Sequence, residues 1–120
     1  MAGLRSRNKG KKGEREFANF LNEHGFKDAK RGIQYKGTKD SPDVEGLDGF
    51  HIEVKRCEAL RLYGAIEKAV DESGDKIPIV AHRKNRKDWV VIILAEDFLR
   101  LVKVINEDRV DNRPYKNFMR

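Results

Sequence analysis

Two carboxylates and a lysine lie close together in the stretch SPDVEGLDGFHIEVKR, which covers residues 41–56. Asp43 begins a short predicted strand, and Glu53 and Lys55 lie two positions apart in the next one. The Asp-Gly dipeptide between them favours a tight hairpin turn, so the chain returns and can bring Asp43 close to Glu53. Two carboxylates at that separation repel each other unless a positive charge lies between them. The pattern therefore predicts a metal site.

Mg²⁺ is the ion that such a site favours, because it takes hard oxygen ligands at about 2.1 Å in octahedral geometry; Mn²⁺ can substitute for it. We expect the side chains of Asp43 and Glu53 and the backbone carbonyl of Val54 to hold the ion. Lys55 would lie beside the metal and orient or help to deprotonate an attacking water. In a basic protein, this chemistry suits phosphodiester hydrolysis, since the metal offsets phosphate charge and the basic surface holds the backbone.

Glu14 is a third candidate acid. It precedes Phe17 and Leu21 on the same face of a predicted helix, so it is expected to point towards the sheet. A carboxylate on an inward stripe is costly unless it is paired or binds a metal. The alternative is that Glu14 lies in the first helical turn, where the helix dipole favours acids. The sequence leaves both interpretations open.

Hydrophobic periodicity and turn residues divide the chain into helices and strands. In chain order, the predicted elements are a helix at 13–24, strands at 26–30, 43–45 and 50–56, a helix at 59–73, strands at 76–82 and 88–95, and a helix at 96–105. Residues 31–41 are predicted to form a loop. The segment 88–95 is almost continuously apolar, which is typical of a central buried strand. This order predicts an α/β or α+β fold with a mixed sheet.

The strand at 50–56 has apolar residues at alternate positions. Period two places His51, Glu53 and Lys55 together on the opposite face, which either meets solvent or forms a site. His51 shares this face with Glu53 and Lys55, so the rim of the site is one possible position for it. We expect surface or structural roles for His24 and His82, and packing roles rather than base stacking for Tyr63 and Trp89.

The length of 120 residues suits one domain, which we expect to cover residues 13–105 between a mobile basic arm at 1–12 and a polar basic tail at 106–120. No apolar run approaches the roughly 18 residues that a membrane span needs. The first residues lack the apolar region of a secretion signal. One cysteine, Cys57, excludes an internal disulfide and a cysteine-based zinc site. These features favour a reducing, cytoplasmic setting.

The net charge is +6 with a pI near 9.5, and the charge is uneven. Residues 5–12 hold five basic side chains and no acid, and residues 83–87 hold four. Such clusters are typical of surfaces that bind nucleic acid, although a solvated tail and hairpin tip have the same composition. The expected DNA-binding residues are Arg5, Arg7, Lys9, Lys11, Lys12, Arg15, Lys36, Thr38, Lys39, Ser41, Arg56, Arg83, Lys84, Arg86 and Lys87.

The stretch SPDVEGLDGFHIEVK resembles the signature of the PD-(D/E)xK nucleases. The closer resemblance is to the archaeal-type Holliday junction resolvases and to the small phage and bacterial nucleases like them. The opening helix of those proteins carries Gly-x-x-x-Glu-Arg, matched here by Gly10, Glu14 and Arg15. The resemblance covers roughly residues 9–95. It implies a single-domain restriction-endonuclease-like fold with the core order α-β-β-β-α-β.

By this resemblance, Glu14, Asp43 and Glu53 are metal-associated acids and Lys55 is the catalytic lysine. Resolvases of this type also use a hydroxyl residue in the loop between the first strands. The chain offers Thr38 and Ser41 there, and the sequence does not decide between them.

The expected function is that of a Mg²⁺-dependent endodeoxyribonuclease acting on four-way or other branched DNA, in DNA recombination or repair. It would work in the cytoplasm, which is the host's if a phage encodes it. Two symmetric cuts require a two-fold homodimer. One alternative is the same chemistry on linear duplex, flap or sequence-specific DNA. Another is a non-catalytic nucleic-acid-binding module whose acids are ordinary surface charges.

Overall fold

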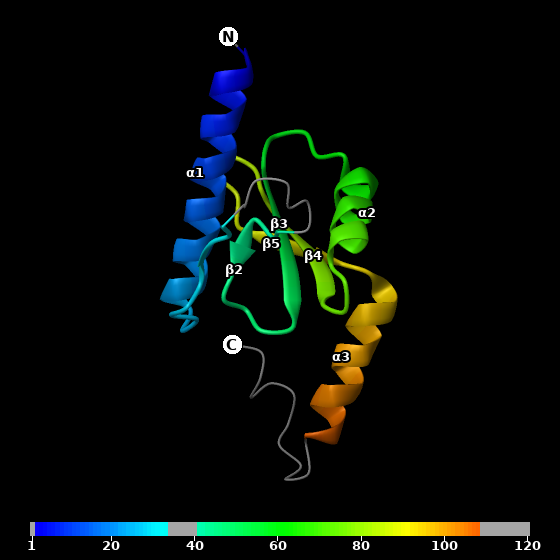
Figure 1. The fold of residues 1–120 in the computed structure, drawn as a ribbon. Helices are drawn as coiled ribbons and strands as arrows, with labels where there is room; N and C mark the ends of the chain where they lie inside the picture. Colours follow the sequence, from blue (N-terminus) through cyan, green and yellow to red (C-terminus); the bar gives the residue numbers. More distant parts are fainter. Residues whose placement is uncertain (1, 34–40, 109–120) are drawn as a thin grey trace.

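The computed structural model describes residues 2–33 and 41–108 (Figure 1). Its elements, in chain order, are α1 (Ala2–Glu23), β1 (Lys30–Arg31), β2 (Val44–Glu45), β3 (Phe50–Arg56), α2 (Leu62–Glu72), β4 (Ile77–Arg83), β5 (Val90–Ile93) and α3 (Ala95–Glu107). The order α-β-β-β-α-β predicted for the core is confirmed.

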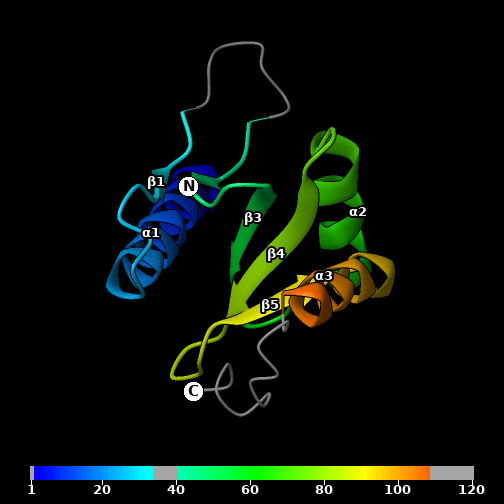
Figure 2. The ribbon, with the colours of Figure 1, turned by 90° about the horizontal axis from the view of Figure 1, so that it is seen from below.

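The strands form one mixed sheet in the order β1-β2-β3-β4-β5. Only β3 and β4 run parallel, and the other described neighbours are antiparallel. A parallel pair needs a crossover connection, which α2 provides. α1 and α2 lie on opposite sides of the sheet (Figures 1 and 2). The chain therefore has the α+β architecture of a restriction-endonuclease-like fold.

Each face of the sheet has its own apolar core. On the α1 side, the buried residues are Phe17, Ala18, Leu21, Ala29, Val44, Ile52, Val54, Ile79 and Ala81. On the α2 side, the core is smaller and consists of Ala65, Ile66, Ala69 and Val80. Because β3 alternates, its even-numbered residues pack under α1 and its odd-numbered residues face α2. The larger core thus holds β3 from one side and leaves the other side for polar residues.

Three predicted elements differ from the structure. The first helix begins at Ala2 rather than Gly13, so residues 2–12 are helical instead of forming an arm. The segment contains no proline and is rich in Lys and Arg, which are good helix formers. The second difference is the first strand, which lies at Lys30–Arg31 rather than at 26–30.

The third difference is β5, which was expected to be central and buried. It is instead an edge strand of the described sheet, and Val90 and Val91 are each 51% exposed. An apolar run indicates that a strand is to be buried, but it does not say whether residues of the same chain or of another molecule bury it. Within the described residues, no helix has both the length and the apolar character needed to cross a membrane.

Gly13 sets how closely α1 approaches β3. A Cβ built at Gly13 would lie 2.6 Å from the Cβ of Arg56, which is too close for any real side chain. The Cβ of Arg56 is fixed to the backbone and cannot rotate away. Alanine at this position would push α1 and β3 apart.

We therefore predict that Gly13→Ala lowers the free energy of unfolding by about 1–3 kcal/mol, the usual cost of overpacking. The matched control is Gly10→Ala, because a Cβ at Gly10 meets nothing within 4 Å. That substitution should stabilise the exposed helix by about 0.5–1 kcal/mol. Denaturant unfolding of both variants measures the difference. Equal effects of the two substitutions would contradict the close approach.

Candidate active site

The β2–β3 pairing brings the first two predicted acids together. Val44 of β2 pairs with Ile52 of β3, which puts Asp43 opposite Glu53. The backbone N–H of Asp43 donates to the carbonyl of Ile52 at 2.8 Å. The backbone N–H of Val54 donates to Asp43 Oδ2, also at 2.8 Å. Asp43, Glu53 and Val54 are therefore neighbours, as the hairpin predicted.

Glu53 is the most deeply buried acid of the group, with its side chain 1% exposed. Its Oε1 lies 3.1 Å from His51 Nε2. Its Oε2 has no hydrogen-bond partner among the described residues and lies 3.5 Å from Lys68 Nζ. Burial, the charge of Asp43 and a hydrogen bond with Glu72 raise the pKa of Glu53 to about 8. Without a bound cation, this carboxyl is largely protonated at neutral pH.

Glu14 points inward from α1, with its side chain 16% exposed. Arg31 Nε donates to its Oε1 at 3.0 Å. Burial and the charge of Asp43 raise the pKa of Glu14, although Arg31 opposes the shift. Because α1 begins at Ala2, Glu14 is not in the first turn, and the helix-dipole interpretation is excluded. Glu14 instead interacts electrostatically with Asp43.

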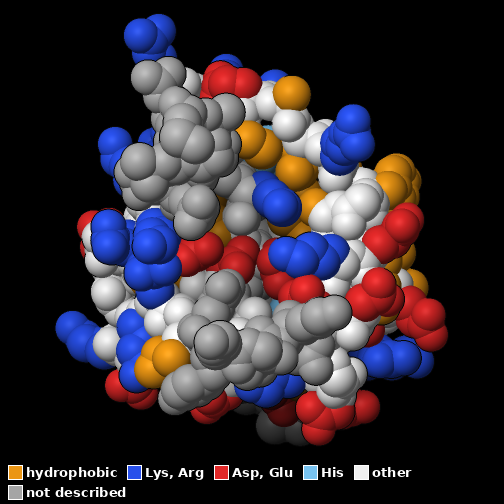
Figure 3. Space-filling view, turned by 45° about the horizontal axis from the view of Figure 1, so that its top comes forward, with side chains coloured by type: hydrophobic (Ala, Val, Ile, Leu, Met, Phe, Trp, Pro, Cys, Tyr) orange, Lys and Arg blue, Asp and Glu red, His pale blue; other side chains and the backbone are white. Residues whose placement is uncertain are grey.

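Lys55 is half-buried on the face of β3 that carries Glu53. It lines a pocket of about 430 Å³ between β3 and α2, and Lys68 lines the same pocket. Burial lowers the pKa of Lys68, but the charges of Glu53, Glu72 and Asp43 outweigh burial and raise it. In Figure 3, acidic side chains gather near the middle of the face with Lys and Arg side chains beside them. The site thus mixes desolvated acids with two lysines.

Three residues near the acids were not predicted from the sequence: Arg31, Lys68 and Glu72. Lys68 and Glu72 are one turn apart on α2, beside the buried stripe that includes Ala65 and Ala69. Their position next to that stripe was the one feature of the sequence that could have placed them near the acids. Polar residues that flank an apolar stripe usually meet solvent, so the signal is weak without knowing what α2 packs against.

The anchoring of Asp43 depends on a close backbone contact. The N–H of Gly32 donates to the carbonyl of Asp43 at 2.8 Å. A Cβ at Gly32 would lie 1.9 Å from the carbonyl oxygen of Pro42, so no other residue fits here without moving the backbone. The chain segments on both sides of residues 34–40 are therefore held together next to the site.

The predicted DNA-binding residues lie in different settings. Lys11, Lys12, Arg15, Lys84, Arg86 and Lys87 are exposed, and Ser41 is half-buried. Arg5, Arg7 and Lys9 belong to α1. Lys36, Thr38 and Lys39 lie outside the described residues. Arg56 and Arg83 both bind the carboxylate of Glu16, with 3.2 Å between Arg56 Nε and Glu16 Oε1.

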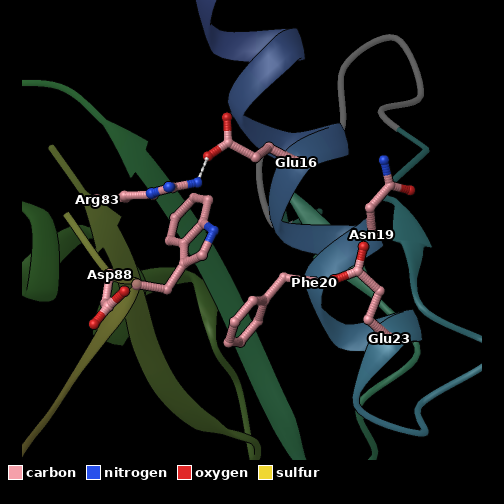
Figure 4. A pocket seen from close by; sticks show the side chains of 7 residues that line it. Glu16, Asn19, Phe20, Glu23, Arg83 and Asp88 are labelled. Atoms are coloured by element: carbon pink, nitrogen blue, oxygen red, sulfur yellow. Dashed lines mark hydrogen bonds and ion pairs between the residues drawn. The ribbon is translucent and has the colours of Figure 1, made fainter. Parts of the chain in front are cut away.

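A second pocket, of about 460 Å³, lies between α1 and the β4–β5 connection. Figure 4 shows Glu16 of α1 reaching towards Arg83 across this pocket. Glu23 and Asp88 also line it, so the pocket carries more acids than bases and is unsuited to phosphate. Trp89 lines it as well and packs on Phe17 with ring centroids 4.8 Å apart. The packing role expected for Trp89 is confirmed.

The other singled-out residues are mostly structural. His82 Nε2 lies 2.9 Å from the carbonyl of Cys57, and His24 Nδ1 lies 2.7 Å from that of Phe20. Tyr63 was expected to pack, but it is 78% exposed at the start of α2. For His51 the sequence allowed a position at the rim of the site, and the structure instead buries it to 3% exposure beside Glu53.

The α+β fold with acids pointing inward is the arrangement expected of the PD-(D/E)xK class. The sequence matches the model of the archaeal Holliday junction resolvase (Hjc) family over residues 5–109. The chain belongs to this family, and the resemblance read from its motifs is confirmed. Searches among curated proteins and among solved structures found no significant match.

Glu53 should make the stability of the metal-free protein depend on pH. Its pKa is about 8 in the folded state and near 4.5 otherwise, so between these values only the folded state holds the proton. The stabilisation by this proton is therefore complete below the unfolded pKa and is lost as pH rises through about 8.

We predict that the melting temperature of the metal-free protein falls between about pH 5 and pH 8, and that Glu53→Gln removes much of this fall. The variant should be the more stable protein at the alkaline end, because its neutral amide needs no proton. The control is Glu67→Gln, an exposed glutamate of α2. An unchanged pH slope in Glu53→Gln would show that another group is responsible.

Proposed function

We propose that this protein is a Mg²⁺-dependent endonuclease that cuts four-way DNA junctions at the site formed by Asp43, Glu53 and Glu14. Membership of the resolvase family supports a nuclease that acts in DNA recombination or repair. The observation that carries the metal dependence is Glu53, a buried carboxyl opposite Asp43 with one oxygen lacking a hydrogen-bond donor. Such a group becomes an anion at neutral pH only if a cation joins it.

The donor set fits Mg²⁺ because it consists of oxygens. Asp43, Glu53 and the carbonyl of Val54 would hold the ion, with Glu14 nearby. When bound, Mg²⁺ supplies charge neutralisation at the phosphate and acidifies a coordinated water. Mn²⁺ shares the preference for carboxylate ligands and can substitute.

The chain's own residues would handle the water and the proton. Lys55 lies on the same face of β3 as Glu53, so its ammonium can hold the water in line with the scissile phosphorus. The water oxygen would bond to phosphorus and release a proton to solvent, while the bond from phosphorus to the leaving deoxyribose oxygen breaks and that oxygen takes up a proton from solvent. Lys68 shares the pocket of Lys55 and would help to hold the phosphate.

Exposed basic residues at two places would hold the DNA backbone. Lys11, Lys12 and Arg15 lie on α1, and Lys84 and Lys87 lie in the β4–β5 connection. Each lysine or arginine that neutralises a phosphate releases counterions, so binding should weaken strongly with salt. Arg56 and Arg83 support this surface indirectly, because Glu16 already binds both.

Cleavage of a labelled four-way junction and of the matching linear duplex, with and without Mg²⁺, tests this function. We predict paired, symmetric cuts in the junction that require Mg²⁺ and fall at least about 100-fold in Asp43→Asn. The control is Glu45→Gln, which alters a solvated acid of β2 that pairs with Lys30. Equal cutting of both DNAs would favour a nuclease of other specificity. Tight binding without cutting in Mg²⁺ or Mn²⁺ would favour the binding module.

We also propose that the enzyme is a homodimer that buries β5 and α3. A junction has two opposed strands to cut, which two copies related by a two-fold axis can reach. These two elements and the residue between them carry many exposed apolar side chains: Val90, Val91, Leu94, Phe98, Leu99, Val104 and Ile105. An apolar patch next to an open strand edge is typical of an interface, and β5 can pair with itself antiparallel about a two-fold axis.

We predict that Phe98→Asp weakens the dimer at least about thirtyfold, because an aromatic residue central to an interface contributes about 2 kcal/mol or more. Val70→Asp is the matched control, since Val70 is an exposed apolar residue on α2. Sedimentation of both variants across a concentration series gives the two dissociation constants. A wild-type protein that stays monomeric, or equal loss in both variants, would contradict this interface.

A further inference from the structure

His51 and Glu72 lie beside Glu53 in one cluster, and the proposed hydrolysis uses only Glu53 of these three residues. One donor atom from each lies within 4.8 Å of the other two. His51 and Glu53 are 3% and 1% exposed, and Glu72 is half-buried with 16% of its side chain exposed. The cluster lies on the α2 side of the sheet, because β3 supplies two members and α2 supplies the third.

We propose that His51 and Glu72, with the carboxyl of Glu53 that they share with the proposed Mg²⁺ site, form a second cation site, selective for a borderline transition metal ion of the Zn²⁺ class. An imidazole nitrogen is a favoured ligand of Zn²⁺ and Co²⁺, whereas Mg²⁺ favours oxygen alone. Two carboxylates and one imidazole make three protein ligands, which leaves a position for water.

The distances support this site. His51 Nε2 lies 3.1 Å from Glu53 Oε1 and 3.8 Å from Glu72 Oε2. Ligand atoms about 2.0–2.2 Å from a tetrahedral or octahedral ion are themselves about 3.0–3.5 Å apart. The three donors therefore need only small side-chain movements to close around an ion.

A second observation is the positive charge already next to the cluster. Lys68 Nζ lies 3.5 Å from Glu53 Oε2, the buried oxygen that lacks a hydrogen-bond donor. The side chain of Lys68 is 54% exposed, so its ammonium can withdraw to water at little cost. A metal ion would replace this loose contact with a direct bond. The structural alternative is that the same residues only form a hydrogen-bonded network under α2.

Metal binding measured by calorimetry distinguishes the metal site from the hydrogen-bonded network. The experiment uses the untagged full chain, stripped of metal, in an Asp43→Asn background that disables the proposed Mg²⁺ site. Zn²⁺ should bind in one equivalent, and Co²⁺ should give the visible absorption of an ion with a nitrogen ligand. Because this readout needs no DNA cleavage, it can fail or succeed independently of the nuclease function.

We expect His51→Gln and Glu72→Gln each to weaken Zn²⁺ binding at least about tenfold, as the loss of one ligand should. Lys68→Met should strengthen it, because a competing cation is removed. The controls are His24→Gln and Glu67→Gln, both exposed, which should leave Zn²⁺ affinity unchanged.

Variants that lower the melting temperature but keep wild-type Zn²⁺ affinity would support the network and overturn the metal site. Loss of Zn²⁺ binding on Asp43→Asn alone would overturn it too, because the ion would then belong to the nuclease site.

Discussion

The register between β2 and β3 is the constraint on which the site depends. Val44 and Ile52 are paired and completely buried under α1. A slip of β2 by one residue would turn Val44 to the opposite face and out of this core, so apolar packing fixes the register. That same register puts Asp43 against Glu53, an arrangement that electrostatics alone would oppose. The hydrophobic core therefore holds together two acids that would separate in its absence.

Much of this half of the molecule could be read from the sequence. The alternation in FHIEVKR gave the bounds of β3 and assigned Glu53 and Lys55 to one face, because strand periodicity is local. The Asp-Gly turn predicted the neighbouring strand that brings Asp43 back. The spacing from Glu14 to Phe17 correctly predicted an inward acid, because one helical face is also a local property.

The rest depends on which surfaces meet, and that information is not local. His51 of β3 meets Lys68 and Glu72 only because α2 packs on the sheet at one particular position along β3. The apolar run 88–95 correctly indicated a strand, but burial of a strand edge requires a partner that a single sequence does not identify. The start of α1 was missed for the converse reason, because charged residues can continue a helix without any core beneath them.

The close contact between Gly32 and Pro42 separates the position of Asp43 from the chain that connects these two residues. Because it fastens the chain on both sides of residues 34–40, the position of Asp43 does not depend on the length of chain between the fastened points. Insertions at this place would therefore leave Asp43 opposite Glu53, because the contacts that fix this pair lie outside the inserted segment.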